Sequence, residues 1–230
     1  MREIAVDIWG DFACFSRPES KVERLTYPVP TPSAMRGLLS AIYSKPQEFY
    51  WQINRIEVLR PLRYISFKRN EVKEVLSVKA DGRPRSDGPI LVDYAGEDGN
   101  KGRTQRQTVA LRDVRYRVHA SICRQPDYHE PEERLYNQAL RRIQRGQCFY
   151  QPSLGLREFV AYFALADGET QPISLDLDLG LMLYDVFDLN KWQVTEKAKP
   201  YVTLFHARLQ QGVLCIPPFD SPEVLRPEVI

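Results

Sequence analysis

The sequence predicts an α+β fold, because strand and helix patterns follow one another in the order strand, helix, strand, strand, helix, strand. Apolar residues alternate with polar ones in the strand segments and recur at helical spacing in the two helix segments. Each helix segment also opens on a proline, which suits the first helical position. This order is the ferredoxin-like βαββαβ plan, which RNA-recognition domains share. A small antiparallel β subdomain is expected to follow.

The first strand and the first helix carry clear signals. Residues 3–15 predict a strand, because one set of alternate positions is apolar: Ile4, Val6 and Ile8. After the proline-rich loop "YPVPTPS", Thr31 can cap a helix and Pro32 suits its first position. We expect this helix to end before Pro46.

The middle of the chain predicts two strands separated by a long loop. Residues 51–68 alternate as a long strand that is broken near Pro61. Residues 79–107 are rich in Gly, Asp and Arg and poor in large apolar residues, which predicts a long loop or hairpin tip. Residues 109–122 alternate again, so we expect the next strand there.

The second half predicts a helix, a strand and then a change of character. Residues 131–145 have an apolar stripe and an arginine stripe, as expected of an amphipathic helix, and residues 156–164 predict a strand. Beyond residue 170, "ISLDLDLGLMLYDVF" alternates with period two and "YVTLFHARLQQGVLCI" predicts a hairpin. We therefore expect a ferredoxin-like domain over residues 1–170, and a small antiparallel β subdomain with an irregular tail over residues 171–230.

Charge is distributed unevenly along the chain, although the net charge is only +2. Arginine gathers between residues 103 and 157, whereas acidic residues are frequent in the C-terminal third. Such an asymmetry is typical of a protein that binds phosphate on one face, and it is equally typical of a solvated charged surface. The arginine-rich region also contains aromatic residues, and RNA grooves combine the two: arginine binds phosphates and rings stack on bases.

Metal and cofactor chemistry has no support in the sequence. The four cysteines are far apart and form no C-x-x-C pair, which favours free thiols in a reducing cytoplasm over a zinc site or a disulfide framework. Four acidic residues of the long loop are more simply explained by solvation than by metal binding: Asp87, Asp93, Glu97 and Asp98. The first residues predict neither a signal peptide nor a membrane span. We therefore expect no metal, no cofactor and no membrane contact.

Several residues are candidates for contact with RNA. Gly146 and Gly155 would let the backbone approach a ligand, and Phe149 either packs in the core or stacks on a base. His119 lies on the polar side of its strand, and each histidine is either an acid–base group or an ordinary surface or packed residue. The predicted RNA-binding residues are Arg36, Arg115, Arg117, His119, Arg141, Arg145, Phe149, Tyr150 and Arg157.

Three motifs resemble a known family. They are "WGDFACFSRPE", "YPVPTPSAMRGLLSAIYSKP" and "RGQCFYQPSLGLREF". With them the chain resembles the CRISPR-associated Cas-five family, subtype I-C, of the RAMP superfamily, from the first strand to about Pro218. The resemblance implies a ferredoxin-like domain with a small C-terminal β domain, which cuts precursor CRISPR RNA within its repeats without a metal. Attack by the ribose 2′-hydroxyl on the adjacent phosphate would leave a 2′,3′-cyclic phosphate.

The resemblance also implies site residues. A tyrosine at the end of the first helix is catalytic in the family, and Tyr43 occupies that position. A Lys-His pair early in the second helix completes the site in some members, but those positions hold Leu135 and Tyr136 here. Arg134 is then the candidate cation, and Tyr136 or His129 the candidate substitute for the histidine.

The partners implied are CRISPR repeat RNA, the 5′ handle of the mature RNA, and the backbone and large subunits of the Cascade complex. A weak contact with duplex DNA is a further expectation. The missing Lys-His pair keeps a second reading open, in which the protein is a non-catalytic architectural subunit that binds the 5′ handle.

Overall fold

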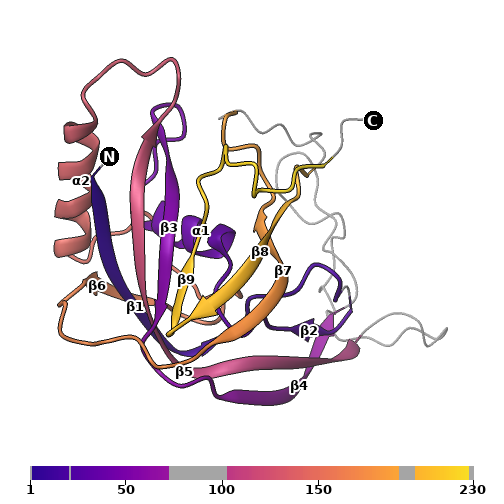
Figure 1. The fold of residues 1–230 in the computed structure, drawn as a ribbon. Coiled ribbons are helices and arrows are strands. Elements are labelled where there is room, and N and C mark those ends of the chain that lie inside the picture. The colour runs from indigo at the N-terminus through magenta and orange to yellow at the C-terminus, as the bar shows by residue number, and fades with distance from the viewer. Residues whose placement is uncertain (1, 21, 73–102, 192–199, 228–230) are drawn as a thin grey trace, which may run out of the picture.

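The computed structural model describes residues 2–20, 22–72, 103–191 and 200–227 (Figure 1). One sheet dominates it: neighbouring strands on its main path are antiparallel, and outside that path β2 pairs with β5 in parallel and β4 pairs with β5 antiparallel. Along that path the strands are β6 (Tyr162–Leu165), β1 (Glu3–Ala13), β5 (Arg103–Arg124), β3 (Phe49–Val58), β9 (Val213–Cys215), β8 (Thr203–Gln210) and β7 (Leu177–Asp185). The remaining elements are α1 (Pro32–Ile42), α2 (Glu132–Gln144), β2 (Arg24–Leu25) and β4 (Tyr64–Val72).

The strands β6, β1, β5 and β3 form the part of the sheet that the two helices connect. β1 lies between β6 and β5, and β3 lies on the other side of β5, with every one of these pairs antiparallel. α1 connects β1 to β3 through the short β2-containing region, and α2 connects β5 to β6. The two helices contact each other, so the end of α1 lies near α2. A mixed α and β fold with an antiparallel sheet, as predicted, is confirmed.

Local sequence explains why α1 forms where it does. Thr31 is the N-cap, and its hydroxyl accepts a hydrogen bond from the Ala34 N–H at 3.2 Å. Pro32 occupies the first turn, as predicted, because the missing N–H costs nothing there. The helix ends at Tyr43, whose extended backbone (φ −148°) leaves the helical path while its N–H still bonds the Leu39 carbonyl.

α2 is oriented by charge and by an apolar stripe. Its first turn holds Glu132 and Glu133, and its last turn holds Arg141 and Arg142, so both ends complement the helix dipole. Three residues at helical spacing are buried against the sheet: Leu135, Ala139 and Ile143. The helix ends one residue earlier than predicted, before Gly146, whose left-handed φ of 62° suits a residue without a side chain.

The predicted strand over residues 51–68 is two strands in the structure. β3 and β4 are separated at residues 59–63, and β4 pairs with the first part of β5 (Figure 1). β5 is therefore longer than predicted, and residues 103–107 belong to it rather than to the predicted loop at 79–107. The reason is cross-strand pairing with β4, for example Gln107 with Lys68, which a single strand's composition does not encode. Residues 79–102 of that loop lie outside the described residues.

The segment before β6 is irregular, so the predicted strand over 156–164 is wrong in its first six residues. Its backbone bonds to other loops instead of a strand, since the Cys14 N–H donates to the Leu154 carbonyl at 3.0 Å. Gly155 passes so close to this point that a Cβ there would lie 1.9 Å from the Cys14 carbonyl oxygen. Only glycine fits this close approach with its φ of 88°.

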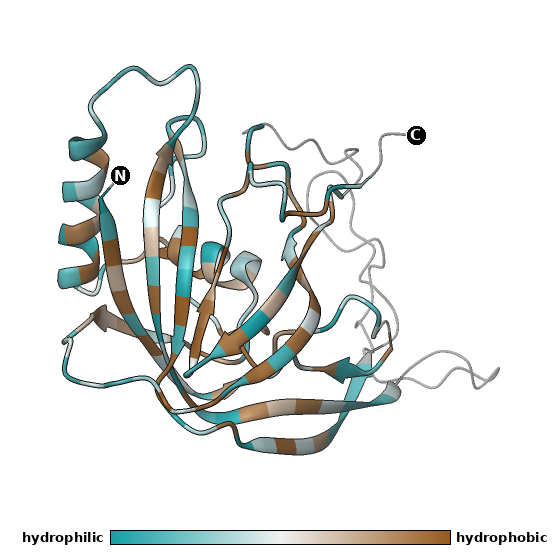
Figure 2. Ribbon diagram, in the orientation of Figure 1, coloured by the Kyte–Doolittle hydropathy of each residue, from teal (hydrophilic) through white to brown (hydrophobic). Residues whose placement is uncertain are grey.

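The C-terminal strands extend the same sheet. β9 pairs with β3, β8 pairs with β9 and β7 pairs with β8. Their apolar residues join one continuous core with those of β1, β3 and β5, and Figure 2 shows the brown and teal bands alternating along the strands. A division of the chain at residue 170 remains a prediction. Neither α1 nor α2, the helices of the described ranges, is long and apolar enough to cross a membrane.

Candidate functional site

Tyr43 lies where α1 meets α2 and the start of β3. Its side chain is buried, with 3% of the residue exposed, and its ring stacks on Phe49 at a centroid distance of 5.3 Å. The Tyr43 carbonyl accepts a hydrogen bond from the Trp51 indole at 2.8 Å. The predicted catalytic tyrosine is thus held by its contacts with Phe49 and Trp51 rather than free at the surface.

Charged and phenolic groups from three segments surround Tyr43, and we call this set the helix-end cluster: Tyr43, Lys45, Glu48, Tyr128, Arg134 and Arg142. Burial raises the pKa of Tyr43 to about 12, and Glu48 and Tyr128 add to that rise. Arg134 and Arg142 act in the opposite direction, because a nearby positive charge favours the phenolate. At neutral pH the Tyr43 hydroxyl therefore keeps its proton.

Glu48 is the ionised carboxylate of the helix-end cluster. Lys45 donates to it across 2.6 Å, and this hydrogen bond lowers the Glu48 pKa more than any other contact. Arg134 lowers it further, while burial and then Glu48 raise the pKa of Tyr128. The cluster thus combines two phenols, three cations and one carboxylate, and its charges act on the pKa values of Tyr43, Glu48 and Tyr128.

A path of exposed rings and cations leads from the helix-end cluster along α1. Phe149 and Tyr150 are 56% and 60% exposed, and the Arg142 guanidinium lies over the Phe149 ring at 4.2 Å. Next to them is a hollow of about 480 Å³ between α1 and residues 150–157, lined by Gly37, Ala41, Tyr150, Ser153, Gly155 and Arg157. Arg145 and Arg157 are exposed and form no ion pair with the described residues. The core alternative for Phe149 is excluded by its exposure.

Three predicted RNA-binding residues of β5 lie elsewhere, on the sheet face opposite the apolar residues that pack on the helices. We call their set the sheet-face network: Glu3, Asp7, Arg55, Glu57, Arg115, Arg117, His119 and Asp167. Arg117 donates to Asp7 at 2.7 Å, to Asp167 at 2.8 Å and to the Thr170 carbonyl at 2.9 Å. These carboxylates, Asp7 first, raise the Arg117 pKa further.

The other two residues of β5 are also paired within this network. Arg115 donates to Asp7 at 2.8 Å and to Asp167 at 3.3 Å. His119, with 7% of its surface exposed, lies between Glu3 (3.0 Å) and Glu57 (2.9 Å). These side chains are engaged in protein contacts and do not join the helix-end cluster.

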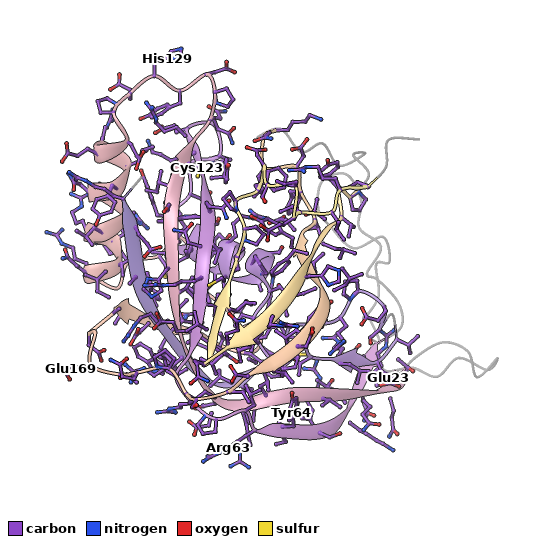
Figure 3. All side chains as sticks on the ribbon, in the orientation of Figure 1. Glu23, Arg63, Tyr64, Cys123, His129 and Glu169 are labelled. Atoms are coloured by element: carbon purple, nitrogen blue, oxygen red, sulfur yellow. The ribbon has the colours of Figure 1, made fainter. Side chains whose placement is uncertain are left out.

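The remaining predicted residues are dispersed. Arg36 forms a bidentate ion pair with the buried Asp185, one contact measuring 2.9 Å, on the side of α1 next to β7. Arg141 is exposed, and within the described ranges its guanidinium donates to Gln138 of its own helix at 2.7 Å. Tyr136 is half-buried, with the Arg2 guanidinium 5.6 Å from its ring. Figure 3 shows His129 at the tip of the β5–α2 loop, where it is exposed.

Sequence reasoning missed four residues of the helix-end cluster: Lys45, Glu48, Tyr128 and Arg142. A signal was present for the first two, because "YSKPQE" places an acid three residues after a lysine, directly beyond the helix end. Tyr128 and Arg142 had no such signal, since their proximity to Tyr43 depends on how α2 packs on the sheet. Leu135, which the resemblance places at one of the two Lys-His positions, is buried with 1% exposed.

The described residues contain no group of three or more His, Cys, Asp and Glu side chains that could hold a metal ion. The predicted solvated acids of the long loop, Asp87, Asp93, Glu97 and Asp98, lie outside the described residues. All four cysteines lie within them, and none is in a disulfide.

Comparison with known proteins gives consistent matches. The model of the family described as "CRISPR-associated protein (Cas_Cas5)" matches residues 3–215. A protein of Thermus thermophilus named CRISPR pre-crRNA endoribonuclease Cas5d is 41% identical over 99% of this chain and 97% of its own length. A protein of the same name from Mannheimia succiniciproducens is 39% identical over 97% and 98%. A solved CRISPR-associated protein, 17% identical, has the same fold, with a TM-score of 0.66 over 97% of this chain and 96% of that one.

Proposed function

The chain belongs to the Cas5 family of CRISPR-associated proteins, and from this we propose that it is an endoribonuclease that cleaves precursor CRISPR RNA within its repeats. The observation that carries the proposal is the helix-end cluster. Tyr43 keeps its proton there, Arg134 and Arg142 are near enough to act on its pKa, and a path of exposed rings and cations begins beside it. The two relatives compared above are named CRISPR pre-crRNA endoribonucleases, and they are 41% and 39% identical to this chain over nearly their full lengths.

The cluster fits cleavage by the RNA's own 2′-hydroxyl. Its oxygen would bond to the adjacent phosphorus while the bond to the 5′-oxygen breaks, leaving a 2′,3′-cyclic phosphate and a 5′-hydroxyl. With a pKa of about 12, Tyr43 is suited to donate its proton to the leaving 5′-oxygen rather than to act as the base. Arg134 would stabilise the charge on the phosphate. No metal ion is needed for these steps.

The proton of the 2′-hydroxyl needs an acceptor, and the proposal gives Glu48 this role. Its carboxylate is ionised at neutral pH, with a pKa that Lys45 and then Arg134 lower further, and its charge acts on the pKa of Tyr43. His129, on the β5–α2 loop, and Tyr136, on α2, are the sequence-based candidates for the same role. The cleavage rates of Glu48→Gln, His129→Gln and Tyr136→Phe, each measured alone, separate the three candidates.

The RNA strand would continue over Phe149 and Tyr150 toward Arg157, with Arg145 and Arg141 at its side. Exposed rings give stacking surfaces, and unpaired guanidinium groups bind phosphates. Because Arg36, Arg115, Arg117 and His119 are bound to carboxylates, we assign them to the support of the fold rather than to RNA.

We further propose that residues 1–170 form a ferredoxin-like domain and that the C-terminal strands form a subdomain joined to it. The strand order β6-β1-β5-β3, with one helix after β1 and one after β5, supports the first part. After cleavage the protein would stay on the 5′ handle as a subunit of Cascade in the cytoplasm. A weak contact with duplex DNA belongs to this proposal as a side activity.

An architectural role without catalysis is the alternative, and one observation favours it. Leu135 is buried in the core, so that position supplies no catalytic group. The two functions differ in whether the purified protein cuts.

The test is incubation of the protein with repeat RNA in EDTA, followed by analysis of the new ends. We expect one cut with a 2′,3′-cyclic phosphate, and a loss of about 100-fold or more in rate for Tyr43→Phe, which keeps the ring stacked on Phe49. Tyr64→Phe is the matched control, since Tyr64 is 52% exposed on β4, far from the His129 loop in Figure 3. Specific binding without any cut would select the architectural role.

A further inference from the structure

The C-terminal end of α1 is completed by groups from the α2 side of the molecule. The last carbonyls of a helix have no partner within it and need donors from elsewhere. Here the Phe149 N–H donates to the Ala41 carbonyl at 2.8 Å, and Arg142 Nε donates to the Ile42 carbonyl at 2.7 Å. These carbonyls belong to the two residues that precede Tyr43 in the chain.

Arg142 and Phe149 are also bound to each other. The Arg142 guanidinium lies 4.2 Å from the centre of the Phe149 ring, within the range of a cation–π interaction. One side chain therefore joins the last turn of α2, the end of α1 and the ring that follows α2. A planar guanidinium can donate from Nε while its face covers a ring. A lysine ammonium has neither an Nε–H along its stem nor a planar face, so it cannot make both contacts in this way.

Tyr43 depends on this arrangement because it follows Ile42 directly. A tilt of the Ile42–Tyr43 peptide would move the Tyr43 hydroxyl, whose ring extends from the first residue outside the helix. The Phe49 stack and the Trp51 bond hold the other side of Tyr43, so the Arg142 contact is the one from α2. Tyr43 is thus held from β3 by Phe49 and Trp51, and from α2 by the bond of Arg142 to the residue before it.

We propose that Arg142 is a positioning residue for Tyr43: its hydrogen bond to Ile42 and its contact with Phe149 hold the end of α1 in the geometry that cleavage requires. The inference rests on the proposed function, because it assigns Tyr43 to the reaction. It differs from a phosphate-binding role, in which only the charge of Arg142 would matter. Its Nε is already used within the protein, whereas Arg145 and Arg157 have no side-chain partner among the described residues.

Arg142→Lys separates the two roles, because it keeps the charge and loses the planar group. We expect the single-turnover cleavage rate at saturating protein to fall about 100-fold, the effect of a misplaced catalytic group. RNA affinity should stay within about threefold of wild type, and its dependence on salt should not change, since no phosphate contact is lost. Arg208→Lys, an exposed residue of β8 paired with Asp178, should leave both quantities unchanged. A cleavage rate restored to wild type in Arg142→Lys would overturn the proposal.

Phe149→Leu is the second variant, and it protects the test if Arg142→Lys folds poorly. It keeps the backbone N–H that bonds Ala41 and removes only the ring, so we expect a smaller loss of about 10-fold in the same rate. An unchanged rate in this variant would count against the ring contact.

Hydrogen exchange gives a reading that does not depend on cleavage. The Tyr43 N–H bonds the Leu39 carbonyl at 2.8 Å, and it should exchange faster in Arg142→Lys than in wild type, without RNA present. If wild type does not cut RNA, the proposed function fails, and exchange still decides whether Arg142 holds the helix end. Equal exchange in the two proteins would reject the positioning role.

Discussion

The path of exposed rings and cations beside the helix-end cluster and the sheet-face network use arginine in opposite ways. Arg117 is buried with 5% exposed and contacts three carboxylates, whereas Arg145 and Arg157 are exposed and have no acidic partner among the described residues. A buried arginine needs its charge matched, and once matched it has little left for a ligand. The comparison teaches that the neighbours of an arginine, more than its place in a basic stretch of sequence, decide whether it is available to RNA.

The largest effect should come from breaking the network at its buried acid. Asp7 is 2% exposed and accepts from both Arg115 and Arg117, so Asp7→Ala leaves buried positive charge unmatched. We expect the free energy of unfolding in urea to fall by about 3 kcal/mol. Asp178→Ala, which breaks the exposed pair with Arg208, should cost less than about 1 kcal/mol. Equal losses in the two variants would show that a buried pair of the network stabilises the fold no more than an exposed pair does.

Removing the exposed arginines should change the free energy of RNA binding by less than Asp7→Ala changes the free energy of unfolding. The double variant Arg145→Ala with Arg157→Ala should weaken binding to repeat RNA about 10-fold near physiological salt and reduce the salt slope by about two, one for each phosphate contact. Filter binding over a series of salt concentrations measures both. Stability should stay within about 0.5 kcal/mol, because neither side chain is buried.

Arg115→Ala is the matched comparison, because Arg115 also lies in the basic stretch but is paired with Asp7 and Asp167. We expect its salt slope to equal that of wild type. A slope reduced as much as in the double variant would show that the sheet-face network contacts RNA after all.

Of the changes considered, protonation of Glu3 in the sheet-face network should have the smallest effect on the free energy of unfolding. Burial raises the pKa of Glu3, but hydrogen bonds from Asn54 and His119 outweigh it, so the pKa lies below 4.5 in the folded protein. Glu3 therefore contributes stability that is fully present above pH 4.5 and is lost as the pH falls through the lower folded value. In Glu3→Gln, unfolding measured between pH 7 and pH 3 should depend less steeply on pH below 4.5. A slope equal to that of wild type would contradict this contribution.

The sequence was sufficient for features that depend on near neighbours in the chain. Thr31 and Pro32 begin α1 as predicted, and Tyr43 stands at its end, because capping and helix termination are local. The alternation in β5 also placed Arg115, Arg117 and His119 together on one side of the strand.

What the sequence did not reveal depends on partners far along the chain. Nothing local to His119 predicts that Glu3 and Glu57 lie on either side of it, because the register of β1 and β3 against β5 decides that. In the same way, β5 extends to Arg103 because β4 lies beside it. Arg142 reaches Ile42 only once α2 has packed on the sheet.

The pairing of β9 with β3 has a consequence for how the molecule reaches its native state. Arg55 pairs with Cys215, and the Gln52 amide accepts from the Phe219 N–H, so an early strand is completed by residues made much later. Until β9 has been synthesised, one edge of β3 has unpaired N–H and C=O groups, on which strands of other chains can aggregate. Nascent or shortened chains that stop before β9 should thus be prone to form insoluble assemblies, and chaperones would act on this edge first.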